Sequence, residues 1–270
     1  MKLKVTINGK AYEAEQGEYI MDLCRRSKIL VPSLCHHEGL PGLGSCRLCV
    51  VEVNEGGGKK VVVSCVYPLS RDCRVFTESK TIRGIRKTIL SMLKTRAPLD
   101  DRLASLCQTY GVESDPESAS ERAFAHFTAP NAGKQMASSC VVCGLCARAC
   151  ASLGAGAIST VGRGVAKEIS TPYEEPSADC IGCGSCAAVC PTKAIECTET
   201  KEERFIWGRK FRLLRCASCG TAFATEEEYA LALKKAGLLP GEEPAPPLCD
   251  ICRKKKSADV MAAAFGERTR

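Results

Sequence analysis

The chain has 270 residues, a net charge of +7 and twenty cysteines, while aromatic residues make up only 5% of it. The first residues, MKLKVTINGK, lead into an alternating strand rather than an apolar signal segment, and no stretch reaches the roughly 18–20 apolar residues of a membrane span. We therefore expect a cytoplasmic protein whose clustered thiols bind metal, not a secreted disulfide scaffold. The charge is mild and lacks the aromatic-interleaved basic stripe of a nucleic-acid binder.

The first 78 residues predict a small sheet crossed by one helix. Apolar residues alternate from the start, and Asn8-Gly9 predicts a hairpin turn. The valine-rich runs 50–53 and 61–63 predict two further strands joined by a glycine loop. A short helix is expected over 22–28, packed across the sheet.

Four cysteines in this region have the spacing of a [2Fe–2S] ligand set. They are Cys35, Cys46, Cys49 and Cys65. The spacing is related to the plant-type pattern, with a longer first gap. Gly39, Gly42 and Gly44 make the loop between the first two ligands pliable enough to fold over a cluster. His36 and His37 suggest a Rieske site, but four thiols already complete the set, so we expect both at the surface near the cluster.

An amphipathic helix is predicted over residues 79–96. Its apolar residues recur at helical spacing at Ile82, Ile85, Ile89 and Leu93. The basic residues of this helix, including Arg86, are expected mostly to face outward. The stretch that follows, residues 113–138, is rich in Glu, Ser and Ala and predicts a linker with some helix.

Residues 139–198 contain two similar cysteine-dense segments, an internal duplication. The first follows C-x2-C-x2-C-x3-C with Cys140, Cys143, Cys146 and Cys150. The second repeats it, followed by Pro191, with Cys180, Cys183, Cys186 and Cys190. In such runs three thiolates hold one [4Fe–4S] cluster and the fourth ligates the other cluster.

We therefore predict two crossed ligand sets. One consists of Cys140, Cys143, Cys146 and Cys190, and the other of Cys180, Cys183, Cys186 and Cys150. Gly144, Gly182 and Gly184 give these loops the backbone freedom to aim N–H groups at sulfur. Two zinc sites would rarely use four cysteines in each run or end in Cys-Pro.

The last segment, residues 199–270, predicts a small knuckle domain. Its two C-x-x-C pairs are Cys216 with Cys219 and Cys249 with Cys252. Between them a helix is expected, with Thr225 as N-cap, three glutamates in its first turn and Gly237 as its stop. Paired knuckles favour a structural zinc site, but a third [4Fe–4S] cluster uses the same number of ligands and stays open.

Four cysteines have no partner at ligand spacing. They are Cys24, Cys73, Cys107 and Cys197. Free cysteine commonly behaves as a small buried hydrophobe, and we expect that of these four.

Two blocks of motifs carry a resemblance to a known group of proteins. LCHHEGLPGLGSCRLCVVEV, with SCVYPLS and VFTES, resembles the N-terminal ferredoxin module of the large iron–sulfur subunit of respiratory complex I and of the iron–sulfur subunits of NAD-linked hydrogenases and formate dehydrogenases. CVVCGLCARAC and CIGCGSCAAVCPTKAI resemble the two-cluster module that follows there. The resemblance covers about residues 1–198.

We expect an α+β architecture in four parts. The resemblance implies a β-grasp [2Fe–2S] ferredoxin domain (1–78) and a bacterial two-[4Fe–4S] ferredoxin-like domain (139–198). The residues themselves predict a helical connector between them (79–138) and a C-terminal four-cysteine domain (199–270). The family usually has a His-x3-Cys-x2-Cys-x5-Cys cluster site in the connector. Here Arg96 stands where the histidine is expected and Cys107 is the lone cysteine. We predict that this cluster is absent, so that the modules are bridged directly or by closer packing.

The sequence has no dinucleotide fingerprint, P-loop or flavin signature, so we assign no catalytic residue and place substrate chemistry in partner subunits. The preferred function is an electron-transfer subunit that links a flavin-containing NAD(P)H-binding subunit to a catalytic subunit for hydrogen, formate or an aldehyde. The alternative is a free polyferredoxin-like carrier that docks transiently with several enzymes. The amphipathic helix, the linker and the extra C-terminal domain favour the first.

Overall fold

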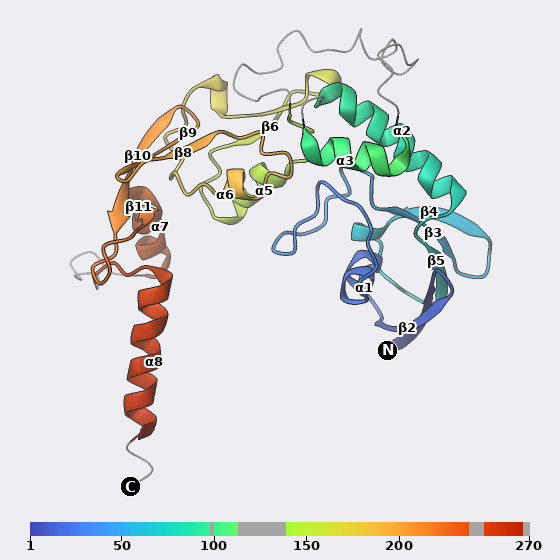
Figure 1. The fold of residues 1–270 in the computed structure, drawn as a ribbon, viewed down its shortest axis with the longest axis horizontal. Coiled ribbons are helices and arrows are strands. Elements are labelled where there is room, and N and C mark those ends of the chain that lie inside the picture. Colours follow the sequence, from blue (N-terminus) through green and yellow to red (C-terminus); the bar gives the residue numbers. More distant parts are fainter. Residues whose placement is uncertain (98–99, 113–138, 238–245, 267–270) are drawn as a thin grey trace.

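The computed structural model describes residues 1–97, 100–112, 139–237 and 246–266. The five-stranded sheet near the N-terminus lies at one end of an arched molecule, the cysteine-dense segment lies in the middle, and a long C-terminal helix extends from the other end (Figure 1). The linker predicted over residues 113–138 lies outside the described residues.

The N-terminal region folds as a five-stranded mixed sheet of order β2-β1-β5-β3-β4. Its strands are β1 (Lys2–Ile7), β2 (Lys10–Glu15), β3 (Val50–Asn54), β4 (Lys59–Val63) and β5 (Cys73–Phe76). β1 pairs with β5 in parallel and with β2 antiparallel, and β3 pairs antiparallel with β4 and β5. Asn8 and Gly9 both have positive φ, 49° and 88°, which two-residue hairpin turns require, and this confirms the predicted hairpin.

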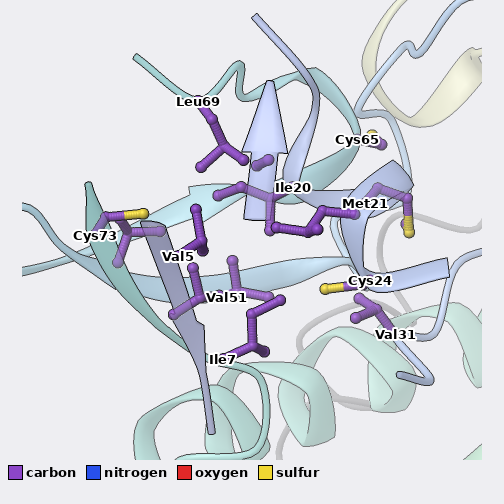
Figure 2. Packing of buried hydrophobic residues seen from close by; sticks show 14 of the residues in the cluster. Val5, Ile7, Ile20, Met21, Cys24, Val31, Val51, Cys65, Leu69 and Cys73 are labelled. Carbon is purple, nitrogen blue, oxygen red and sulfur yellow. The ribbon is translucent and has the colours of Figure 1, made fainter. Parts of the chain in front are cut away.

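Helix α1 (Ile20–Arg26) packs across this sheet. It begins two residues before the predicted start because Ile20 and Met21 are buried against the strands. Figure 2 shows Ile20, Met21 and Cys24 lying over Val5 and Val51 of the sheet. The apolar face of the helix and one face of the sheet thus form a core of their own.

Helix α2 (Lys80–Arg96) is confirmed, with the Ser79 hydroxyl accepting from Ile82 N at 3.2 Å. The outward orientation expected for Arg86 is wrong, because its side chain is fully buried. Arg86 donates to Leu48 O at 2.9 Å and Val50 O at 3.0 Å, and pairs with Glu78. Arg86 lies four residues after Ile82 and four before Leu90, so it belongs to the buried stripe.

Helix α3 (Asp101–Tyr110) packs against α2. The Asp100 carboxylate caps it by accepting from Leu103 N at 2.7 Å. The Tyr110 hydroxyl lies 2.9 Å from Arg86 Nη1, so α3 helps to enclose the buried arginine. The chain leaves α3 through Gly111, which has a φ of 65°.

The duplicated segment contains little regular structure. Its elements are α5 (Leu145–Ser152), β6 (Ser159–Val161), β7 (Glu168–Ser170) and α6 (Ser185–Ala188), with single 3-10 turns at Gly164–Ala166 and Pro172–Glu174. β6 and β7 pair antiparallel over three residues each. Gly144 and Gly184 precede α5 and α6 with φ values of 75° and 73°.

A four-stranded antiparallel sheet of order β11-β10-β9-β8 follows, which was not predicted from the sequence. Its strands are β8 (Cys197–Glu199), β9 (Glu203–Ile206), β10 (Arg209–Arg215) and β11 (Ala222–Thr225). Cys197 starts the edge strand β8 and is exposed, so the burial expected for it is wrong, whereas Cys24, Cys73 and Cys107 are buried as expected.

After this sheet the described residues form helices α7 (Glu226–Lys235) and α8 (Asp250–Gly266). Helix α7 is confirmed with its predicted cap, because the Thr225 hydroxyl accepts from Glu228 N at 3.1 Å. Helix α8 projects away from the rest of the molecule (Figure 1). Of the helices within the described ranges, none combines the length and the apolar character that a bilayer crossing requires.

Candidate iron–sulfur and metal centres

The four N-terminal cysteines lie together as two pairs, and all four are buried. Cys46 N donates to Cys35 Sγ at 3.3 Å, and Leu34 N donates to Cys46 Sγ at 3.4 Å. In the second pair, Cys49 Sγ lies 3.5 Å from Cys65 Sγ. The loop therefore presents one thiol pair from Cys35 and Cys46 and a second from Cys49 and Cys65.

One thiol of each pair ionises readily. A hydrogen bond with Cys46 sets the pKa of Cys35 at about 6 against the opposing effect of burial, and a hydrogen bond with Cys65 does the same for the pKa of Cys49. The same hydrogen bonds, together with burial, raise the pKa values of Cys46 and Cys65. Each pair thus holds a thiolate in a buried position, and thiolate is the form that binds iron.

At Gly42 the ligand loop passes close to the backbone of Cys65. A Cβ on Gly42 would lie 2.3 Å from Cys65 O, a clash that the backbone would have to relieve. His36 is half-buried, with Nδ1 3.4 Å from Arg25 Nη1, and the exposed His37 accepts from Gly39 N at 3.1 Å. Both histidines therefore make local contacts near the loop.

The first ligand loop of the duplicated segment lies near the end of the second. Burial is the main cause that raises the pKa of Cys140 and of Cys143, the latter to about 11, and the charge of Cys190 contributes to both shifts. Backbone N–H groups point at sulfur in both segments, with Val142 N 3.4 Å from Cys140 Sγ and Ala194 N 3.3 Å from Cys190 Sγ.

The other four thiols of the duplication line one cavity. It is bounded by Cys150 from the first segment and by Cys180, Cys183 and Cys186 from the second, with apolar walls that include Ile158, Ile206 and Trp207. Trp207 Nε1 donates to Cys186 Sγ at 3.4 Å. The structure thus brings the last cysteine of one motif to the first three of the other.

The unanticipated sheet β8–β11 supports the loop around this cavity. Arg204 donates to Gly182 O at 2.8 Å, and Arg209 donates to Cys180 O at 2.7 Å. The Thr225 hydroxyl donates to Ile181 O. The Phe211 ring lies against Gly182, where a Cβ would approach it to 2.4 Å. The alternation of apolar residues through β10 was the sequence signal that could have predicted this strand. It does not tell which carbonyl groups of the ligand loop the side chains of the sheet would reach.

The [2Fe–2S] candidate loop packs directly on the first cysteine loop of the duplication. Cys35 and Cys46 share one buried core with Cys143, Leu145 and residues of α2 and α3. Arg148 of α5 donates to Cys35 O at 2.8 Å and also contacts Pro41 O.

Arg96 and Cys107 stand where the family usually has the relay cluster site of the connector, and both make structural contacts. Arg96 donates to Lys167 O at 2.6 Å, and Cys107 is buried with Sγ 4.0 Å from Leu90 O.

The four C-terminal cysteines form a compact group. The sulfur atoms of Cys216, Cys219, Cys249 and Cys252 all lie within 4.8 Å of one another. Cys219 Sγ lies 3.8 Å from Cys249 Sγ. The Cys249 backbone N–H lowers the pKa of Cys216 to about 6, so the group holds a ready thiolate. Both knuckles thus converge on one four-sulfur site.

The residues present fit iron–sulfur clusters. Eight thiols are buried among the twelve predicted ligands, and backbone N–H groups are aimed at several of them. A thiol-walled cavity stands at the second site of the duplication. Near the first site of the duplication, Arg148 Nε is buried with no hydrogen-bond partner among the described residues. Such thiol-lined, N–H-rich surroundings suit anionic sulfur cofactors.

Two family models match the two regions just described. Residues 1–80 match the 2Fe-2S iron–sulfur cluster binding domain, and residues 139–194 match the 4Fe-4S dicluster domain. The chain therefore contains a 2Fe-2S iron–sulfur cluster binding domain and a 4Fe-4S dicluster domain.

Its homologues include subunits of NADH-ubiquinone oxidoreductases. The chain is 30% identical over 179 residues to the NADH-ubiquinone oxidoreductase 75 kDa subunit of Reclinomonas americana, covering 63% of this chain and 26% of that protein. It is 32% identical over 99 residues to the mitochondrial NADH-ubiquinone oxidoreductase 78 kDa subunit of Neurospora crassa, covering 37% of this chain and 13% of that protein. It thus spans about a quarter or less of these relatives.

A solved structure shares much of the fold. A chain of an NAD+-reducing [NiFe]-hydrogenase in the H2-reduced state superposes with a TM-score of 0.51 at 25% identity, covering 63% of this chain and 74% of that chain. The chain is therefore related both to complex I and to an NAD+-reducing hydrogenase.

Proposed function

We propose that this chain is an electron-transfer subunit of a multi-subunit oxidoreductase, with one [2Fe–2S] and two [4Fe–4S] clusters. Bound clusters would carry single electrons, and this chain's residues would hold them in a row. The observation that carries the proposal is the single buried core shared by Cys35, Cys46 and Cys143. It sets the N-terminal site beside the duplicated one, as a continuous electron path requires.

For the N-terminal domain we propose a β-grasp ferredoxin fold. The mixed sheet with parallel β1 and β5, crossed by α1, supports it. The thiol pairs favour Cys35 and Cys46 as ligands of one iron and Cys49 and Cys65 as ligands of the other. The short paired strands and twin loops of the duplication favour the bacterial two-cluster fold.

The crossed ligand sets are part of the proposal. The cavity with Cys150 beside Cys180, Cys183 and Cys186 favours one set. The charge of Cys190 acting on Cys140 and Cys143 favours the other. We further propose that the usual relay cluster is absent and that direct contact between the modules replaces it, because Arg96 donates to Lys167 O and Cys107 is buried against Leu90.

For the C-terminal cysteines we propose zinc rather than a third [4Fe–4S] cluster. Zn–S bonds of about 2.3 Å place the sulfurs of a tetrahedron about 3.8 Å apart. The 3.8 Å between Cys219 and Cys249 Sγ and the 4.8 Å limit for the group fit one ion. A cube with iron at its corners needs its thiolates further apart. The site would join the two knuckles and play no redox part.

We propose partner subunits at both ends of the electron path and a cytoplasmic location. The relatives' names speak of NADH oxidation and of an NAD+-reducing hydrogenase, which favours a flavin-containing NAD(P)H-binding subunit on one side. A hydrogenase, formate dehydrogenase or aldehyde oxidoreductase subunit would lie on the other. The alternative is a free polyferredoxin-like carrier. Native purification separates them, since a stable flavoprotein complex supports the first and a 28.9 kDa monomer supports the second.

Metal analysis and one cysteine variant test the cluster assignment. About ten iron atoms and one zinc per chain are expected, from one [2Fe–2S] and two [4Fe–4S] clusters. The change Cys190→Ala should damage the cluster held by Cys140, Cys143 and Cys146, seen as loss of one [4Fe–4S] EPR signal. Cys197→Ala is the matched control and should leave the iron content unchanged. About fourteen irons without zinc would overturn the zinc site, and about eighteen would mean that a relay cluster is present.

A further inference from the structure

Arg148 lies where the two iron–sulfur modules meet. It is on helix α5, between the ligand candidates Cys146 and Cys150, and is half-buried. Its side chain leaves its own module and reaches the backbone of the N-terminal ligand loop more than a hundred residues away in sequence. Within the part of the chain that the structure describes, Arg148 supplies the side-chain hydrogen bonds that run from the duplicated segment to that loop.

The guanidinium group makes two contacts that bracket the loop. One Nη donates to the carbonyl of the ligand Cys35 at 2.8 Å, and the other contacts the Pro41 carbonyl. The planar guanidinium is a fork of donors in fixed directions, so it can bind both carbonyls at once. A lysine ammonium would act as a single point charge. The contacts hold the loop segment that follows the first predicted ligand against α5.

Apolar packing on both sides completes the junction. Leu34 and Leu48 of the N-terminal loop lie in the same buried core as Val141 and Leu145. A Cβ on Gly144 would lie 3.5 Å from Leu43 Cδ2, which is an ordinary van der Waals contact. Arg148 therefore sits at a packed interface rather than at a hydrated gap.

The charge of Arg148 also acts on the N-terminal site. Its Nη2 lies 2.8 Å from the carbonyl oxygen of Cys35, so the guanidinium cation stands beside the backbone of a predicted ligand. A cation at this place favours the more negative, reduced state of a cluster bound to that loop.

We propose that Arg148 is a positioning residue for electron transfer between the [2Fe–2S] site and the first [4Fe–4S] site. Its fork fixes the spacing of the two sites, and its charge makes the [2Fe–2S] cluster easier to reduce. The inference rests on the proposed relay function. The electron moves alone, so no bond forms or breaks and no proton is transferred.

The test separates the fork from the charge. Arg148→Lys keeps the charge and loses the fork, Arg148→Gln loses both, and Arg163→Gln removes an equal charge from an exposed arginine of the same segment. The readouts are the midpoint potential of the [2Fe–2S] EPR signal and its magnetic broadening by the neighbouring reduced cluster. Neither depends on turnover.

We expect Arg148→Gln to disfavour [2Fe–2S] reduction roughly tenfold, which is a fall of about 59 mV, and to reduce the broadening. Arg148→Lys should keep the potential near that of the unaltered protein but reduce the broadening. Arg163→Gln should change neither.

Two outcomes would overturn the role of Arg148. One is Arg148→Gln behaving like Arg163→Gln, and the other is undiminished broadening in Arg148→Lys. If Arg148→Gln fails to assemble clusters, the lysine variant alone decides. Failure of the proposed function looks different, because the unaltered protein would then show no [2Fe–2S] signal or no broadening at all.

Discussion

The N-terminal domain and the duplicated segment hold their cysteines in different ways. Sixteen buried residues form the N-terminal core, and only Cys49 and Cys65 among them are predicted ligands. The core around the duplicated segment has nine, and three of these are the predicted ligands Cys146, Cys180 and Cys186. The first domain has a sheet and helix that bury one another, while the second is built largely around its thiols.

This difference indicates what each domain needs in order to fold. Burial of apolar surface is the main favourable contribution to folding, and a short segment with little of it depends on metal or disulfides. Strands β6 and β7 have three residues each, and those of β6 are all exposed. Cluster binding should therefore supply much of the folding free energy of the duplicated segment, as structural metals do in small domains.

Removal of iron should give the largest effect and test this comparison directly. After anaerobic chelation, amides of residues 140–195 should exchange hydrogen nearly as fast as in an unfolded chain, while those of β1 and β3 keep most of their protection. Hydrogen exchange with mass spectrometry measures both regions in one sample. Equal loss of protection in the two regions would show that the N-terminal sheet also needs its cluster.

A core substitution should show the reverse selectivity. Leu23 on α1 is fully buried in the N-terminal core, so Leu23→Ala should destabilise that domain by about 2–5 kcal/mol. The measure is the opening free energy of β3 amides in native-state hydrogen exchange. Leu30→Ala, at a side chain that is 86% exposed, is the control and should change it by less than about 0.5 kcal/mol. The [4Fe–4S] EPR signals should survive in both variants, and their loss in Leu23→Ala would mean that the domains fold as one unit.

Trp207 offers a smaller and more local test. Its indole N–H donates to Cys186 Sγ, and such a bond would stabilise negative charge on this predicted cluster ligand. Trp207→Phe keeps an aromatic wall on the cavity but removes the donor, so one [4Fe–4S] midpoint potential should fall while the [2Fe–2S] potential stays. Tyr173→Phe, at a side chain 94% exposed, is the control for EPR-monitored redox titration. An unchanged pair of [4Fe–4S] potentials would remove Trp207 from any tuning role.

Features set by local chemistry were predictable from the sequence. The Asn8-Gly9 hairpin, helix α2 and the Thr225 cap follow from residues within a few positions of one another. The four C-terminal cysteines were predicted as one site, and their sulfur atoms do converge. The ligand sets of the iron–sulfur sites stay predictions, which the thiol pairs and the thiol-lined cavity support.

Features set by distant partners were not predictable. Arg86 is buried because Leu48 and Val50, 36 to 38 residues away, present carbonyl groups to it. Cys197 is exposed because its strand is the edge of a sheet whose very existence was missed. In each case the local pattern gave the residue type, but the partner depends on tertiary packing.

The smallest expected effect comes from the Thr225 hydroxyl, which connects the C-terminal sheet to the second ligand loop. It accepts from Glu228 N and donates to Ile181 O, and its residue is fully buried. Thr225→Val keeps the shape but removes both hydrogen bonds, and loss of the cap alone should cost about 1 kcal/mol. Thr225→Ser keeps the hydroxyl and is the control. The measure is hydrogen exchange of α7 and of the 180–183 loop. If only α7 loosens in the valine variant, the sheet supports the cluster loop through Arg204 and Arg209 rather than through this hydroxyl, because those two side chains still hold the carbonyls on either side of Ile181.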